Sequence, residues 1–385
     1  MKTIAVIGAG TMGSGIAQVA LTNQCKVYLY DVSESVLQKA KSNIEQSLSK
    51  LVEKQKITSS QKDIFLQNLH LISSFDIIKD AELVIEAIIE NLDAKKNLFK
   101  EIEKYVSSQC ILATNTSSLS VHSMIKELQY PNRFLGIHFF NPAPLMPLVE
   151  VIPTILTDNN ITQLVLKTLA DWGKTTVVAK DTPGFIVNRI ARPFYSEALR
   201  IYDEGIADLV TIDWTMKNIG GFRMGPFELM DLIGHDVNYV VTETVWTQMY
   251  YDPKYKPSIT QKRLLEAGLL GKKTGRGFYD YSQPLPTEPN IKDENIHHQI
   301  FMRILSMLIN EAADALYYNI ASREDIETAM TKGVNYPKGL LHWADELGIS
   351  TIYNELMKLY DWYQEDRYRP SVLLKQKINN KQNFF

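Results

Sequence analysis

The fold of the first part of the chain is decided by the stretch Ile4-Ala5-Val6-Ile7-Gly8-Ala9-Gly10-Thr11-Met12-Gly13. Its four leading apolar residues predict a buried strand, and the small residues after Gly13 predict the first turns of a helix. Gly8 permits a tight turn, Gly10 lets the backbone approach a diphosphate, and Gly13 lets the helix pack closely on the strand. The amino end of that helix favours an anion. We therefore expect a dinucleotide to bind along Gly8, Gly10, Thr11, Met12 and Gly13.

An acidic residue, Asp31, closes the second predicted strand, eighteen residues after Gly13. A carboxylate at this place accepts hydrogen bonds from the ribose hydroxyls of NAD. It also repels the 2′-phosphate that distinguishes NADP. The sequence therefore predicts NAD as the cofactor of a Rossmann domain.

Short apolar runs, spaced by helical patterns, continue through the first half of the chain. This alternation predicts an α/β domain over residues 1–181, with a mostly parallel, doubly wound sheet. The longest helix is expected from about Glu34 to Val52. The predicted strands are Thr3–Ile7, Lys26–Tyr30, Leu83–Ala87, Cys110–Ala113, Phe134–Phe140, Leu148–Ile152 and Lys174–Val178.

The residues after 181 are predicted to be almost entirely helical and to contain an internal duplication. Pairs recur 114 positions later without a gap: Arg189-Ile190 as Arg303-Ile304, Glu197-Ala198 as Glu311-Ala312, and Ile206-Ala207 as Ile320-Ala321. Such a constant offset favours two copies of one domain, 182–282 and 283–385, over two unrelated helical bundles. A proline-containing stretch, 282–295, is expected to link them.

The composition excludes several classes of partner. The 385 residues carry a net charge of −3, which gives no basic field for nucleic acid or anionic lipid. No apolar run approaches the length of a membrane span, and the amino terminus lacks the layout of a signal peptide. The two cysteines predict no disulfide framework. We expect a cytoplasmic protein without a metal ion at its site.

Two residues that are costly to bury occur in neighbouring apolar strands. His138 lies in Phe134–Phe140 and Glu150 lies in Leu148–Ile152. A lone histidine in a strand is more often a satisfied core residue, and a buried carboxylate is unfavourable without a partner. If the two pair, Glu150 fixes the tautomer of His138 and raises its basicity. The other ring nitrogen is then a general base.

Two further polar positions could contact a substrate. Asn115-Thr116-Ser117-Ser118 follows a predicted strand, so it lies at the carboxyl end of that strand. Such a run also caps helices, and the two roles can coexist. Asn188 begins the first helix after residue 181. Its apolar neighbours favour a buried, hydrogen-bonded role over a surface one.

Seven motifs, in order and at matching spacing, resemble the L-3-hydroxyacyl-CoA dehydrogenase family over about residues 1–281. They are the glycine loop, Glu86–Leu92, Asn115–Ser118, His138–Pro142, Glu150-Val151, Asp181–Arg189 and Gly271–Tyr279. The resemblance implies a Rossmann domain followed by an all-α C-terminal domain, here present in two copies. It also implies NAD-dependent, reversible oxidation of (S)-3-hydroxyacyl-CoA to 3-oxoacyl-CoA. A short substrate such as 3-hydroxybutyryl-CoA, in fatty-acid β-oxidation or related metabolism, is expected.

The resemblance also implies roles for single residues. His138 is the catalytic base and Glu150 its partner, while Ser117 and Asn188 bind the substrate oxygen. Ser47 and Lys54 contact coenzyme A, although Lys54 could equally be a solvated lysine beside Lys50 and Lys56. The positions that line the NAD site are Glu90, Lys95, Asn115, Asn141 and Lys273.

The second helical copy carries no counterpart of this chemistry. Met302 stands where the first copy has Asn188, and nothing matches the run Gly271–Thr274. We interpret the copy as structural. Because shorter family members dimerise through this helical domain, the copy could replace a dimer partner, which predicts a monomer or a weak homo-oligomer.

Three alternatives remain open. A 3-hydroxyadipyl-CoA dehydrogenase of aromatic degradation uses the same chemistry, and no motif reports the depth of the acyl pocket. A sugar-acid dehydrogenase related to lens λ-crystallin has the same plan but no use for coenzyme A, so Ser47, Lys54 and the duplicated segment argue against it. A structural protein that only binds NAD is disfavoured, because all four catalytic positions are present.

Overall fold

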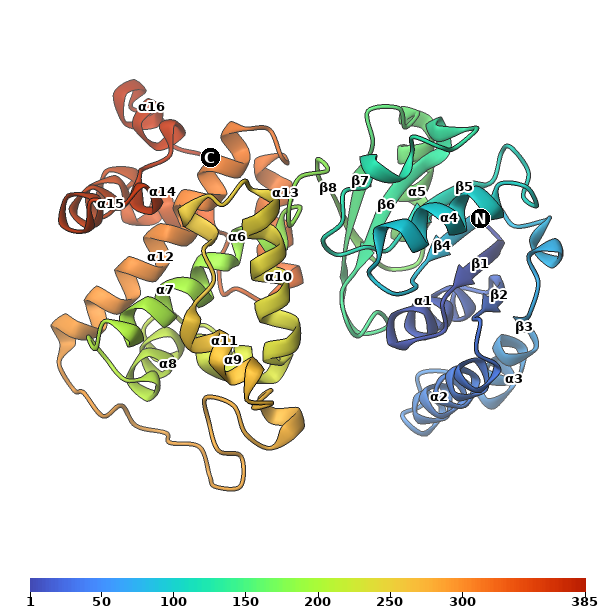
Figure 1. The fold of residues 1–385 in the computed structure, drawn as a ribbon, viewed down its shortest axis with the longest axis horizontal. Coiled ribbons are helices and arrows are strands. Elements are labelled where there is room, and N and C mark those ends of the chain that lie inside the picture. The colour runs from blue at the N-terminus through green and yellow to red at the C-terminus, as the bar shows by residue number, and fades with distance from the viewer. The chain divides into compact units, whose positions relative to one another are not determined.

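One eight-stranded sheet organises residues 1–181, which form the first of two units; residues 182–385 form the second. The computed structural model describes all 385 residues. The strands follow the order β3-β2-β1-β4-β5-β6-β7-β8 (Figure 1). They are β1 (Thr3–Ile7), β2 (Lys26–Tyr30), β3 (Leu69–Ile72), β4 (Leu83–Glu86), β5 (Ile111–Thr114), β6 (Phe134–Phe139), β7 (Leu148–Pro153) and β8 (Thr175–Val178).

The prediction of a mostly parallel sheet is confirmed, with two additions. All neighbouring strands are parallel except β6 and β7. The connection between these two is a short loop, which is too short for the helical crossover that a parallel pair needs. The edge strand β3 was not predicted, because its apolar run is only four residues long and is interrupted by His70.

Five α-helices accompany the sheet in the first unit. They are α1 (Thr11–Thr22), α2 (Glu34–Glu53), α3 (Ser59–Gln67), α4 (Leu92–Ile102) and α5 (Asn159–Asp171). The long helix α2 buries Leu37, Ala40, Ile44 and Leu48. This spacing of three or four residues places them on one face, toward the core formed with β1, β2 and α1.

The second unit is helical and contains two similar series of elements, eight in the first copy and six in the second. The first helical copy comprises α6 (Val187–Ile190), α7 (Arg192–Asp203), α8 (Leu209–Asn218), α9 (Pro226–Ile233), α10 (His235–Gln248), η4 (Pro253–Tyr255), α11 (Ile259–Glu266) and η5 (Lys272–Thr274). The second helical copy comprises α12 (Glu294–Tyr317), α13 (Arg323–Gly333), α14 (Leu340–Leu347), α15 (Ile349–Tyr363), η6 (Asp366–Tyr368) and α16 (Val372–Asn380).

Helix α12 is the central element of this unit (Figure 1). It packs against α6, α7 and α8 of the first copy and against α13 to α16 of the second. An unbroken run of its residues, from Ile300 to Ala315, is buried. A helix that is buried on every side is expected at the middle of a bundle, where it has no solvent face to keep polar.

The two copies are joined by reciprocal buried salt bridges. Arg189 Nε donates to Glu311 Oε1 at 2.5 Å, and Arg303 Nε donates to Glu197 Oε2 at 3.0 Å. The arginines are 114 positions apart, and so are the glutamates. The contact is therefore self-complementary, as across a two-fold axis.

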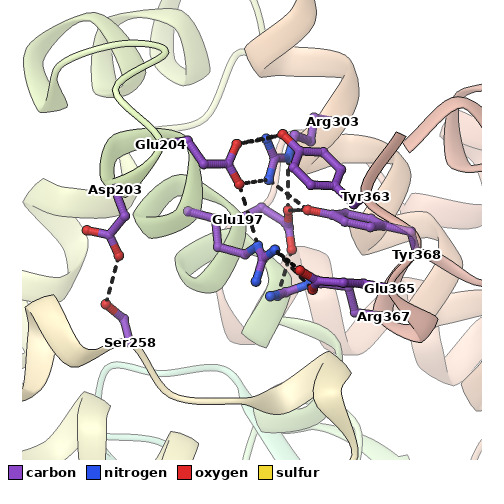
Figure 2. A network of polar contacts seen from close by, with 10 residues as sticks. Glu197, Asp203, Glu204, Ser258, Arg303, Tyr363, Glu365, Arg367 and Tyr368 are labelled. Carbon is purple, nitrogen blue, oxygen red and sulfur yellow. Dashed lines mark hydrogen bonds and ion pairs between the residues drawn. The ribbon is translucent and has the colours of Figure 1, made fainter. Parts of the chain in front are cut away.

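Each glutamate also receives a tyrosine and a second cation. Tyr368 and Arg367 contact Glu197 at 3.0 and 2.8 Å, as Figure 2 shows. On the other side, Tyr255 donates to Glu311, whose second oxygen is 4.0 Å from Lys254 Nζ. Because these charges are buried and paired on both sides, removing one partner would leave another uncompensated.

The second copy ends on a contact that the sequence did not suggest. Asp345 accepts the backbone N–H groups of Phe384 and Phe385. In the first copy, Asp231 accepts those of Phe278 and Tyr279. The second copy thus has no run like Gly271–Thr274, but it keeps two aromatic residues whose N–H groups donate to an aspartate.

Candidate active site

The carboxyl ends of β1, β2, β4, β5 and β6 lie along one edge of the sheet, because these strands are parallel. Most of the predicted site residues follow these ends directly. The order of the sheet reverses between β1 and β4, so the chain leaves them in opposite directions. Ligands of open α/β sheets bind at such a point.

The glycine loop has the geometry that a diphosphate needs. Gly8 has a φ of +103°, and a Cβ there would lie 2.5 Å from the carbonyl oxygen of Ala87. A Cβ at Gly13 would lie 1.7 Å from the carbonyl oxygen of Gly8, so the start of α1 packs directly on the loop. A Cβ at Gly10 would meet no protein atom within 4 Å. Gly10 therefore faces open space beside Thr11 and Met12, where a phosphate group fits.

The first turn of α1 supports the same conclusion. Its N-cap is Gly10, and no side chain accepts a hydrogen bond from the exposed N–H groups. Asp31 lies beside the loop, where its carboxylate accepts the N–H of Ala9 at 2.8 Å and that of Ser33 at 3.0 Å. The residues of this region fit a dinucleotide, with Asp31 near the position of a ribose.

His138 and Glu150 form a buried pair. They stand directly opposite each other on the antiparallel strands β6 and β7, so their side chains project from the same face. His138 Nδ1 lies 2.6 Å from Glu150 Oε2, and the two residues are 5% and 0% exposed. A carboxylate can only accept, so Nδ1 carries a proton; in the neutral imidazole, the lone pair is then on Nε2.

Glu90 organises the loop that carries Ser117. Its Oε1 accepts the hydroxyl of Thr116 at 2.6 Å, the N–H of Ser117 at 3.0 Å and the N–H of Ser118 at 3.2 Å. Burial alone would raise the pKa of Glu90, but Lys95 and these donors outweigh it and lower that pKa. The charged carboxylate therefore holds the backbone of the loop in one conformation.

Lys95 connects this loop to the strand before it. The lysine is 1% exposed, and its Nζ lies 2.5 Å from Glu86 and 3.2 Å from Glu90. Glu86 also accepts the hydroxyl of Thr114 at 2.7 Å. Lys95 therefore faces two carboxylates. Its contribution to a cofactor site, as the structure places it, is to hold Glu90 and the serine loop.

The two predicted asparagines follow neighbouring strands. Asn115 comes directly after β5, and its Oδ1 accepts the N–H of Phe139 at 2.9 Å, which ties the ends of β5 and β6 together. Asn141 follows β6 and precedes Pro142. Together with Ser117 and His138, both residues lie at the carboxyl edge.

The predicted coenzyme A residues line a cavity of about 850 Å³ that begins at the glycine loop. Ser47 is on α2, and Lys54 directly follows the end of that helix. Four other lysines share the lining: Lys39, Lys50, Lys56 and Lys174. The cavity is thus large, begins where a dinucleotide would start, and is rich in cations.

Asn188 and Lys273 belong to the second unit, so the first unit does not contain them. Asn188 lies on α6, and its carbonyl oxygen accepts Arg192 Nε at 2.8 Å. Lys273 is in η5, where its ammonium group pairs with Asp236. The roles of these two residues stay predictions.

Two family models match almost the whole chain. The model described as "3-hydroxyacyl-CoA dehydrogenase, NAD binding domain" matches residues 3–182. The model described as "3-hydroxyacyl-CoA dehydrogenase, C-terminal domain" matches residues 184–281 and 300–383. The chain belongs to the 3-hydroxyacyl-CoA dehydrogenase family. It is an NAD-dependent oxidoreductase, as the glycine loop and Asp31 predicted, and its helical domain is present in two copies.

Relatives of this dehydrogenase family cover different shares of the chain. The 3-hydroxyadipyl-CoA dehydrogenase of Escherichia coli is 34% identical over 98% of this chain and 97% of its own. The mitochondrial hydroxyacyl-coenzyme A dehydrogenase of Homo sapiens is 42% identical, but over 73% of this chain and 91% of its own. A solved structure of 3-hydroxybutyryl-CoA dehydrogenase from Escherichia coli, 34% identical, aligns with a TM-score of 0.94 over 98% of both chains.

The chain therefore oxidises 3-hydroxyacyl-CoA with NAD, as the resemblance implied. None of its helices combines the length and the apolar composition that crossing a bilayer requires.

The sequence had given no role to Glu86 or Thr116, which hold Lys95 and Glu90 in place. The signal that could have found Glu86 is a glutamate that closes an apolar strand, Leu83-Val84-Ile85-Glu86.

Proposed function

We propose that the chain oxidises short (S)-3-hydroxyacyl-CoA substrates with His138 as the catalytic base. The observation that carries this proposal is the buried pair of His138 and Glu150, 2.6 Å apart at the carboxyl edge of the sheet. A histidine whose tautomer is fixed by a carboxylate is suited to take and return one proton.

The reaction divides among four side chains. His138 Nε2 takes the proton of the 3-hydroxyl, and Glu150 stabilises the imidazolium that results. Ser117 and Asn188 hold the oxygen as it becomes a carbonyl. NAD, when bound, accepts the hydride that leaves C3. Base catalysis of this kind contributes about 10²–10⁴ in rate. In the reverse direction, the imidazolium returns the proton to a 3-oxoacyl group.

The remaining predicted residues bind the two coenzymes. Gly8, Gly10, Thr11, Met12 and Gly13 hold the diphosphate of NAD and Asp31 its ribose. Five further residues line the NAD site: Glu90, Lys95, Asn115, Asn141 and Lys273. Ser47 and Lys54 contact coenzyme A. The lysines around the 850 Å³ cavity support this assignment, because coenzyme A carries several phosphate charges.

We also propose a cytoplasmic enzyme of fatty-acid β-oxidation or related acyl-CoA metabolism that is a monomer or a weak homo-oligomer. The self-complementary salt bridges between the helical copies support the last point. They satisfy within one chain a surface that would otherwise need a second chain.

The base is tested by His138→Gln, which keeps a polar side chain of similar size. The value of kcat should fall by about 10²–10⁴, while the Kd for NAD, measured by calorimetry, stays near wild type. The matched control is His122→Gln, since His122 also contacts a carboxylate, that of Asp181, at 2.6 Å. Turnover retained by His138→Gln would remove His138 as the base.

A further inference from the structure

One buried cation in the chain lacks an anionic partner. Seven lysines and arginines are buried, and six of them form salt bridges: Lys95, Arg133, Arg189, Lys254, Arg303 and Arg367. The seventh is Arg192, at the start of α7, which is 4% exposed. A charge buried without a counterion is unfavourable, so its presence calls for an explanation.

All the hydrogen-bond acceptors of Arg192 are neutral. Its Nε donates to the carbonyl oxygen of Asn188, and one terminal nitrogen donates to Thr242 Oγ1 at 2.9 Å and to the carbonyl oxygen of Asn238 at 3.4 Å. The guanidinium also lies 4.9 Å from the centre of the Tyr195 ring. These contacts fix the position of the group, but none of them neutralises its charge.

A buried donor of the second copy, near Arg192, lacks an acceptor. The hydroxyl of Tyr336 is buried and has no hydrogen-bond partner. Burial raises the pKa of Tyr336. Its ring centre lies 5.8 Å from that of Phe194, which is two residues after Arg192 on α7. A guanidinium without a counterion and a phenol without an acceptor can together bind an anion such as a carboxylate.

The helical fold itself does not need this arginine. The equivalent position in the second copy, 114 residues later, is Ser306, on the buried helix α12. The second copy has no counterpart of Asn188, since Met302 stands in its place. Arg192 therefore occurs only in the copy that also carries Asn188.

The proposed function supplies a source for the anion. If Asn188 holds the oxygen on C3 of the substrate, the guanidinium of Arg192 lies beside the same residue, because its Nε is 2.8 Å from the carbonyl oxygen of Asn188. In a six-carbon acyl chain, three carbon–carbon bonds of roughly 1.5 Å separate C3 from the far carbon C6. A carboxyl group at C6 would thus be at about the right distance to reach the guanidinium.

We propose that Arg192 and Tyr336 receive a carboxylate at the far end of the acyl chain, so that this enzyme prefers 3-hydroxyacyl-CoA thioesters of short dicarboxylic acids. The inference rests on the proposed role of Asn188. It makes Arg192 a specificity-determining residue that contacts the end of the acyl chain opposite the thioester.

Two substrates of equal length test the proposal: 3-hydroxyadipyl-CoA, which ends in a carboxylate, and 3-hydroxyhexanoyl-CoA, which ends in a methyl group. The wild-type enzyme should have a higher kcat/KM for the first, by about tenfold or more. Arg192→Met should lower kcat/KM for 3-hydroxyadipyl-CoA by about 10–150-fold, the value of a hydrogen bond to a charged group, and leave 3-hydroxyhexanoyl-CoA unchanged. Arg192→Lys should lose less, because it keeps the charge.

Two further variants separate specificity from folding. Tyr336→Phe removes only the hydroxyl that lacks a partner, and it should lower kcat/KM for the dicarboxylyl substrate alone, by about 2–10-fold. Arg200→Gln is the matched control on the same helix; Arg200 already pairs with Glu365, so its loss should affect both substrates equally.

The possible outcomes are distinct. An equal loss on both substrates in Arg192→Met would make Arg192 a structural tie between α7 and α10 and overturn the inference. A wild-type enzyme that does not distinguish the two substrates would also overturn it, even if the variants fail to fold. If the wild type forms no NADH from either substrate, the proposed function itself fails.

Discussion

The two helical copies are most alike where they meet and least alike where substrate is expected. Arg189 and Glu197 in the first copy have Arg303 and Glu311 as their counterparts, and each arginine reaches the glutamate of the other copy. By contrast, Asn188 has become Met302, and Arg192 has become Ser306.

This difference separates two constraints on one fold. A buried interface of paired charges tolerates little change, because each loss leaves an uncompensated partner. A position that contacts substrate is constrained only in the copy that has a site. The chain thus contains its own control for which residues the fold requires and which the reaction requires.

The largest expected effect concerns the interface. Glu197→Gln and Glu311→Gln should each lower the free energy of unfolding of the helical unit by about 3–5 kcal/mol, because each leaves buried cations without a carboxylate. Urea unfolding would measure this. The control is Glu365→Gln, whose half-exposed ion pair with Arg200 should contribute about 1 kcal/mol or less. If Glu197→Gln lowers the free energy of unfolding and Glu311→Gln does not, the two salt bridges are alike in geometry but not in their contribution to stability.

A second comparison exchanges the residues that differ. Asn188→Met places the second copy's residue in the first, and it should lower kcat by about 10²–10³, the value of a lost donor to a developing oxyanion. Met302→Leu, the matched change in the second copy, should leave kcat unchanged. Steady-state kinetics at saturating NAD would measure both. Equal activity of the two variants would remove Asn188 from the reaction.

The smallest effect concerns the ends of the two copies. Asp345→Ala removes the acceptor for the N–H groups of Phe384 and Phe385, and it should cost about 1–3 kcal/mol of stability without changing kinetics. Asp231→Ala removes the acceptor beside the loop that carries Lys273, so it should also raise the KM for NAD. If Asp345→Ala raises that KM as well, the end of the second copy contributes to the binding of NAD.

Local pattern was enough to predict much of the fold and part of the site. The strand, glycine loop and helix of residues 4–13 are adjacent in sequence, so their spacing alone specified the turn. His138 and Glu150 were found because each is unusual in its own strand. The constant offset of 114 residues revealed the two copies without any knowledge of their contacts.

The parts that could not be predicted depend on contacts between distant segments. Glu90 gains its role only when β4 and β5 bring it beside Thr116 and Ser117. Arg192 is unusual only because no carboxylate lies near it, and a missing partner leaves no trace in a sequence. No run like Gly271–Thr274 precedes Phe384-Phe385. Its similarity to Phe278-Tyr279 became visible only in the structure, where each pair donates its N–H groups to an aspartate.

The central position of α12 has a consequence for the order in which the chain is made. Ribosomes add roughly 5–20 residues per second, and domains usually fold as they emerge. Here, the buried face of α7 must wait for α12, and Glu197 must wait for Arg303 and Arg367. During that interval the nascent helices expose an apolar surface and an unpaired charge. Because the covering segment arrives on the same chain, this exposure ends without the arrival of a second molecule.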